Sequence, residues 1–139
     1  MQRYRFAEDA EAGDENYRCY TFNDPLQIFK QIIKDEDLEE VQLCISTRLQ
    51  LDSIVDQVES YLRWLTECES VLRNYYEHEL GKPVHSTWFD EIEIYRVDLT
   101  FNSEQDYGAT ISCGDSVLQD HILIIDFDKE AVEAIHLNG

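Results

Sequence analysis

The chain contains few basic residues. Lysine and arginine number 11 against 30 aspartates and glutamates, which gives a formal net charge of −19 over 139 residues. Nucleic-acid backbones are bound by clustered lysine and arginine, and anionic membranes attract polybasic segments. We therefore expect neither nucleic acid nor a membrane surface as a partner.

Long apolar runs are also missing. No stretch approaches the roughly 20 consecutive apolar residues that a membrane-spanning helix needs. The N-terminal segment MQRYRFAEDAEAGDENY lacks the apolar region of a secretory signal peptide. We therefore expect a cytoplasmic protein in which the cysteines stay as free thiols. The four cysteines, none in a Cys-x-x-Cys pair, are Cys19, Cys44, Cys68 and Cys113.

No motif in the sequence specifies a reaction or a bound cofactor. The five glycines form neither a phosphate-binding loop nor a dinucleotide fingerprint. The four histidines include no His-x-x-x-His pair, and no acidic run has the spacing of an EF-hand loop. We expect no cofactor and no metal site, and the sequence assigns no catalytic residue.

The chain does contain enough apolar and aromatic residues for a folded core. Hydrophobic residues make up 43% of it, and there are eight tyrosines, six phenylalanines and two tryptophans. Disordered acidic chains are poor in such residues. The length is that of one domain, so we expect residues 1–139 to fold as a single unit.

Hydrophobic spacing predicts two helices of unequal length. Apolar residues recur at alternating steps of three and four from Leu51 to Tyr75, which predicts a long helix over residues 52–80. Gly81 and Pro83 are typical of a helix C-terminus. A shorter helix is predicted over residues 25–34, because Asp24 and Pro25 suit its first turn.

Period-two alternation predicts strands on both sides of these helices. Two short strands are expected within residues 4–22 and another at 41–46, and a C-terminal antiparallel meander follows at 91–101, 107–113, 121–127 and 131–137. A shift of apolar parity indicates a bulge near Tyr95 and Arg96. The expected fold is therefore α+β, with an antiparallel sheet of about five to seven strands against one long and one short helix.

Acidic residues gather in three regions, residues 8–15, 35–40 and 90–93, with aromatic residues near the last. Protein-binding surfaces often place aromatic anchors within a polar rim, and negative potential steers a basic partner. The alternatives are that the charge serves solubility and that Trp88 and Phe89 belong to the core. The candidate partner-binding residues are Asp35, Glu36, Asp37, Glu39, Glu40, Asp90, Glu91 and Glu93, with Trp88, Phe89 and Tyr95 as anchors.

In overall character, a small and very acidic α+β domain with cysteines resembles the immunity proteins of bacterial toxin systems. The segments WFDEIEIYRVDLTF, DYGATISCGD and HILIIDFDKEAVEAIHL also look like small uncharacterised bacterial domains. The resemblance to immunity proteins implies that the chain binds and blocks a basic toxin, such as a nuclease. Our leading expectation is a cytoplasmic inhibitor whose partner is a basic protein.

Two other classes of function remain open at this point. The first is a small hydrolase-like enzyme that uses carboxylates in a cleft, or Cys113 with His121 across a hairpin loop. Cys113 continues an alternating apolar series, which favours a core thiol instead. The second is a structural or regulatory subunit that dimerises through the long helix, and both a monomer and a homodimer are compatible with the sequence.

Overall fold

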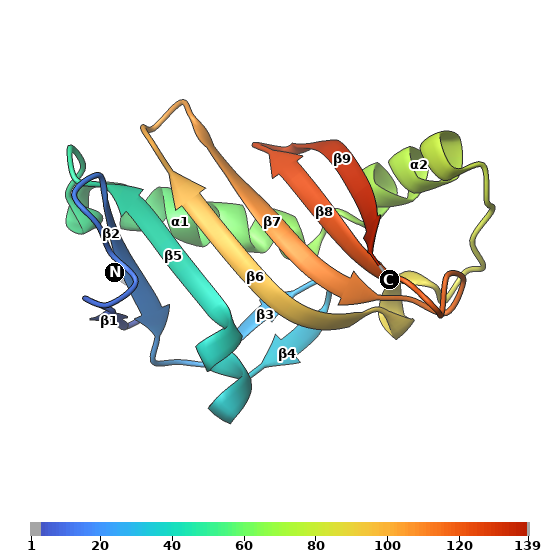
Figure 1. The fold of residues 1–139 in the computed structure, drawn as a ribbon, viewed down its shortest axis with the longest axis horizontal. Helices are drawn as coiled ribbons and strands as arrows, with labels where there is room; N and C mark the ends of the chain where they lie inside the picture. Colours follow the sequence, from blue (N-terminus) through green and yellow to red (C-terminus); the bar gives the residue numbers. More distant parts are fainter. Residues whose placement is uncertain (1–3, 139) are drawn as a thin grey trace.

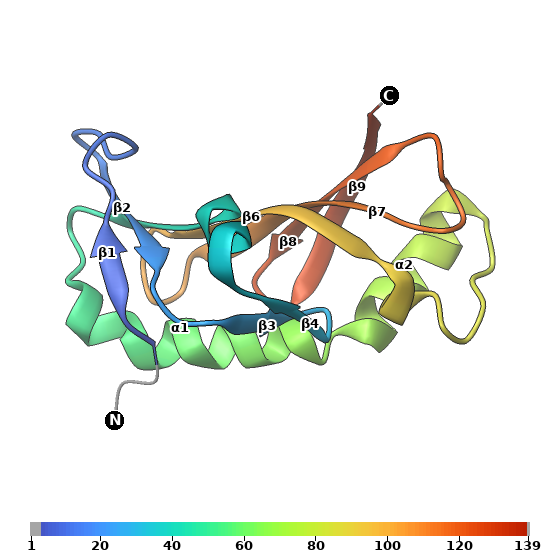
Figure 2. The ribbon, with the colours of Figure 1, turned by 90° about the horizontal axis from the view of Figure 1, so that it is seen from below.

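The computed structural model describes residues 4–138 and forms two layers (Figures 1 and 2). One layer is a seven-stranded sheet with the strand order β1-β2-β5-β6-β7-β8-β9. Helices α1 (Leu51–Thr66) and α2 (Glu69–Leu80) pack against one face of this sheet. The predicted α+β class with a mostly antiparallel sheet is therefore confirmed. Within residues 4–138, no helix has the length and apolar character needed to cross a membrane.

The strands lie close to the predicted positions. They are β1 (Phe6–Glu8), β2 (Tyr17–Phe22), β5 (Val41–Ser46), β6 (Glu93–Phe101), β7 (Tyr107–Gly114), β8 (Ile122–Asp128) and β9 (Ala131–Asn138). The register of β6 against β7 shifts between Ile94 and Arg96, which confirms the predicted bulge. One pair differs from the expected antiparallel sheet, since β5 and β6 run parallel. The two helices connect them, and a parallel pair requires such a crossover.

Directly paired residues across the sheet show why its two faces differ. The row that faces the helices is Tyr20, Leu43, Leu99, Ala109, Phe127 and Val132. The next row, on the opposite face, is Thr21, Gln42, Asp98, Thr110, Asp126 and Ala134. Because side chains alternate along each strand, one face forms the core and the other stays polar.

The predicted long helix is divided into α1 and α2. Glu67 and Cys68 interrupt it, and Cys68 is 1% exposed at the break. The apolar series continues through Cys68, so the periodicity contained no sign of the interruption. Gly81 has a positive φ of 65° after α2, as the predicted C-terminal stop requires. The apolar residues of α1 face the sheet, including Ile54, Val58 and Leu62, so this helix face is not free for a dimer.

The prediction of a helix over residues 25–34 is wrong. This segment forms a two-stranded hairpin, β3 (Leu26–Ile28) and β4 (Gln31–Ile33). Phe29 and Lys30 form its turn with positive φ angles of 53° and 62°. Phe29 is fully buried, with its ring centroid 5.2 Å from that of Phe89. Burial of this turn residue in the core favours the hairpin over the helix.

The prediction of four free thiols is also wrong. Cys19 of β2 lies directly opposite Cys44 of β5, and the two form a disulfide. Cys68 and Cys113 are the two free cysteines of the described chain, and both are buried. The cross-strand register brought together two cysteines that are 25 residues apart in the sequence.

Candidate partner-binding site

Two of the three predicted aromatic anchors belong to the core. Trp88 and Phe89 are both 0% exposed, so neither side chain can contact a partner. The Trp88 ring packs 4.9 Å from Tyr76, and its Nε1 donates a 2.8 Å hydrogen bond to Asp115 Oδ2. Their assignment as anchors is therefore corrected. The third, Tyr95, is 46% exposed and stays a candidate.

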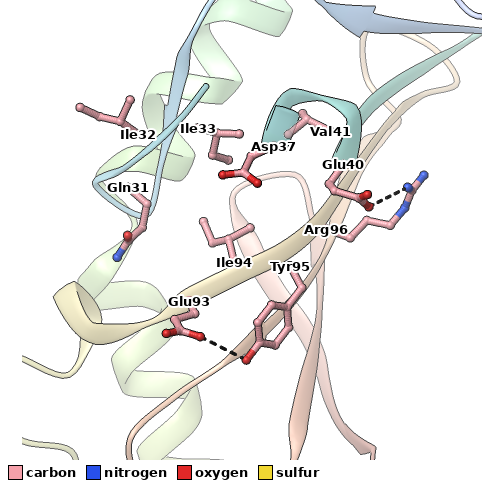
Figure 3. Close-up of a pocket in the computed structure, with 10 residues that line it drawn as sticks. All are labelled: Gln31, Ile32, Ile33, Asp37, Glu40, Val41, Glu93, Ile94, Tyr95 and Arg96. Atoms are coloured by element: carbon pink, nitrogen blue, oxygen red, sulfur yellow. Dashed lines mark hydrogen bonds and ion pairs between the residues drawn. The ribbon is translucent and has the colours of Figure 1, made fainter. Parts of the chain in front are cut away.

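A groove of about 300 Å³ lies between β4 and the first half of β6 (Figure 3). One wall is Gln31, Ile32 and Ile33 of β4, and the other is residues 93–96 of β6. The 3-10 helix η1 (Asp35–Glu40), the teal coil that precedes β5 in Figure 1, contributes Asp37 and Glu40. β4 and η1, which are neighbours in the sequence, thus form one concave surface with the distant strand β6.

The groove has an apolar component that solvent can reach. Ile32 is 70% exposed, and it and Tyr95 are two of the four large hydrophobic residues exposed in residues 4–138. Ile33 and the partly buried Ile94 face the groove from its two walls, whereas the Ile32 side chain points to the outer side of β4 (Figure 3). Ile33, Ile94 and the exposed Tyr95 give the groove an apolar lining, as interaction sites often have.

The carboxylates of Asp37, Glu40 and Glu93 surround this apolar surface. Asp37 points into the groove between its two walls (Figure 3). Glu40 forms a 3.6 Å ion pair with Arg96, which also binds Asp98 at 2.9 Å. The hydrogen bond with Asp98, and to a smaller extent the charge of Glu40, raise the pKa of Arg96. Arg96 is the single basic residue that lines the groove, so the local charge is negative.

Tyr95 is held at the edge of the groove by its neighbours on the sheet. Its hydroxyl donates a long 3.5 Å hydrogen bond to Glu93 Oε2. Desolvation first, and the Glu93 carboxylate second, raise the pKa of Tyr95. The ring passes close to Gly114 on β7, where a Cβ atom would lie 2.5 Å from the Tyr95 oxygen.

The other predicted acidic residues lie outside this groove. Asp35 and Glu39 line a separate hollow on the other side of η1, and Glu36 is exposed to solvent. Asp90 and Glu91 belong to the 3-10 helix η2 (Phe89–Glu91). The structure therefore brings together Asp37, Glu40, Glu93 and Tyr95 of the predicted set and separates the rest.

Glu91 is already engaged by its own neighbours. It accepts hydrogen bonds from Thr87 at 2.6 Å and pairs with His85 at 3.0 Å. The Thr87 bond is the larger cause, with His85 second, of a lowered pKa at Glu91. Glu91 lines a third hollow with Tyr95, Ser116 and His121, on the far side of Tyr95 from the groove.

Prediction from the sequence missed all three groove residues of β4, as well as Val41, Ile94 and Arg96. Ile32 and Ile33 looked like the apolar face of a helix, so their place in a hairpin at the surface was hidden. Gln31 donates a 3.0 Å hydrogen bond from Nε2 to the Asp90 carbonyl, which ties β4 to the start of η2. The adjacent pair Ile32–Ile33 was the available signal, because a strand must expose one of two neighbouring residues.

The geometry does not support a thiol nucleophile. Cys113 is 0% exposed, and burial raises the pKa of its thiol to about 12. A buried, protonated thiol cannot attack a substrate. His121 lines the hollow beside Glu91 and Tyr95 instead. In the part of the chain that the structure describes, no group of three or more His, Cys, Asp or Glu side chains is arranged to hold a metal ion.

Asp126, a carboxylate of β8, is likewise held by its neighbours in the sheet. Asp126 accepts a 2.9 Å hydrogen bond from Thr110 Oγ1 and lies 3.2 Å from His136 Nε2, all on the polar face.

Comparison of the chain with protein-family models, curated proteins and solved structures found no match.

Proposed function

We propose that this protein binds a basic protein through the groove between β4 and β6, as an immunity-type inhibitor binds its toxin. The observation that carries the proposal is the combination of an apolar lining, formed by Ile33, Ile94 and the exposed Tyr95, with three carboxylates in one depression. Apolar side chains supply affinity when they are buried, and carboxylates select partners that present lysine or arginine.

The distribution of charge supports a protein partner of positive charge. The net charge of −19 attracts basic molecules over long range, and the groove offers short-range contacts to the same molecules. Blocking a toxin requires only that the bound surface overlaps its active region. Inhibition by binding therefore needs no catalytic group on this chain.

A pull-down with matched variants tests this proposal. The groove variant carries Asp37→Asn, Glu40→Gln and Glu93→Gln, and the control variant carries Asp56→Asn, Glu79→Gln and Glu130→Gln. Both lose three negative charges, and the control residues are exposed acids of α1, α2 and the turn after β8. Partners from a bacterial lysate are identified by mass spectrometry at low and moderate salt.

The expected result is a basic protein that is retained by the wild type and the control variant. The groove variant should lose it, and moderate salt should weaken its capture because the charges are exposed to screening. Equal capture by all three proteins, or capture of acidic proteins alone, would contradict the proposal.

A further inference from the structure

The first half of β6 has a free edge that faces the groove. The pairing of β5 with β6 begins at Val41 opposite Val97. Residues 93–96 of β6 extend beyond that point, and in residues 4–138 no strand pairs with them on the β5 side. On their other side Glu93, Ile94 and Arg96 pair with β7, and Tyr95 lies in the bulge. A strand edge of this kind presents backbone N–H and C=O groups to whatever lies beside it.

The groove is bounded at both of its ends, which limits the length of a strand that could be added there. At one end, η1 precedes β5 and its Glu40 is linked to Arg96 by the 3.6 Å ion pair. At the other end, Gln31 joins β4 to the Asp90 carbonyl. Four strand residues span roughly 13 Å, so the open edge of β6 suits a short extended segment.

We infer that the groove binds an extended basic segment of the partner, which adds to β6 as a strand in line with β5. This inference rests on the proposed function and names the mode of binding at the same site. Backbone hydrogen bonds to residues 93–96 would hold the segment, as in other cases of strand addition to a sheet edge.

The surroundings of the edge define the side-chain chemistry of the segment. Alternate side chains of an added strand point to opposite faces. One set meets the apolar surface of Ile33 and Ile94 within the groove. The other set meets the carboxylates of Glu40 and Glu93, which pair with lysine or arginine. The segment therefore alternates apolar and basic residues.

Charge argues against a second copy of this chain as the occupant. Two copies would each bring a net charge of −19. The strand segments nearest the groove are acidic in both copies. Like charges placed opposite one another destabilise strand pairing. Acidic side chains at a free edge thus disfavour self-association and favour a basic partner.

Alternate N-methylation of a short peptide tests the backbone contribution. The parent peptide alternates lysine and valine, and two derivatives carry N-methyl groups on either the lysines or the valines. N-methylation removes the backbone donors that point to one edge and leaves every side chain and charge in place. Binding to the full chain is measured by calorimetry at low salt, and amide hydrogen exchange is followed at residues 93–96.

The expected result is binding of the parent peptide with slower exchange within residues 93–96. One methylated derivative or both should bind at least tenfold more weakly. Equal binding of all three peptides would overturn strand addition and leave the proposed function standing. No binding of the parent peptide would overturn the inference, and the pull-down would still decide the proposed function. A dimer in sedimentation that dissociates in the groove variant would make a second copy the occupant and overturn the inference.

Discussion

At the scale of single residues, two glycines of β7 differ in what a side chain would meet. A Cβ atom on Gly108 would overlap the backbone carbonyl oxygen of Phe127 on β8. On Gly114 it would meet the mobile end of Tyr95, which can rotate away. Backbone atoms therefore leave no room for a side chain at Gly108, whereas at Gly114 another side chain occupies the space.

We expect Gly108→Ala to lower the free energy of unfolding by about 1–3 kcal/mol, since β7 and β8 must separate to admit the methyl group. Gly114→Ala should cost less, about 1 kcal/mol or below, and should displace Tyr95 from the groove. Urea unfolding monitored by tryptophan fluorescence measures both. A Gly108→Ala protein as stable as the wild type would contradict the packing described.

The two buried thiols make the free energy of unfolding depend on pH in the alkaline range. Burial raises the pKa of Cys68 and of Cys113 from 9.0 to about 12. Above pH of about 9 the unfolded chain loses these protons while the folded chain keeps them, so the free energy of unfolding falls as pH rises. Below about pH 8 the two thiols add no slope.

Urea unfolding between about pH 7 and pH 10 measures this slope. The variant with Cys68→Ala and Cys113→Ala is the control, and its stability should fall less steeply over the alkaline range. Identical slopes for the two proteins would show that the thiols ionise as readily in the folded state as in the unfolded chain.

At the scale of elements, the hairpin β3–β4 shows what the sequence could and could not predict. Leu26, Phe29 and Ile33 fit the spacing of a helix, and Asp24–Pro25 fits its start. Leu26, Ile28 and Ile33 fit a hairpin equally well, with Ile32 left exposed. Short apolar runs are ambiguous in this way, and contacts of Phe29 with Phe89 and Phe127 decide the outcome.

The longer elements were predictable because their patterns are sustained. The strands after residue 91 and the bulge near Tyr95 follow from alternation over many residues. The candidate site was predictable only in part, because the charges of Asp37, Glu40 and Glu93 are visible in the sequence but their convergence is not. The groove depends on the hairpin β3–β4, in a segment where the sequence pattern predicted a helix.

The disulfide between β2 and β5 provides a test at the same scale. It closes a loop of 25 residues, and a crosslink of that size stabilises a fold by about 3 kcal/mol through the unfolded chain. Reduction, or the variant with Cys19→Ala and Cys44→Ala, should lower the urea midpoint accordingly. An unchanged midpoint with and without reductant would show that the bond does not contribute to stability.

At the scale of the whole molecule, acidic residues are spread over loops, helices and the polar sheet face. Such an excess of like charge destabilises the compact state by repulsion. Ion pairs such as Arg5–Asp24 and Arg73–Glu69 offset only a small part of this repulsion, because exposed pairs are individually weak.

We therefore expect salt to stabilise the fold. Raising sodium chloride from about 20 mM to about 500 mM shortens the screening length several-fold, and the melting temperature should increase by several degrees. Thermal unfolding followed by circular dichroism measures the change. A melting temperature that falls with salt would mean that attractive pairs outweigh the repulsion.

We assign recognition of a basic segment to the groove and not to the overall charge. Titration of the lysine–valine peptide into the wild type, the groove variant and the control variant at low salt separates these two causes. We expect the control variant to bind within about twofold of the wild type and the groove variant to bind at least tenfold more weakly. Equal weakening of the two variants would contradict the account, since net charge alone would then explain the binding.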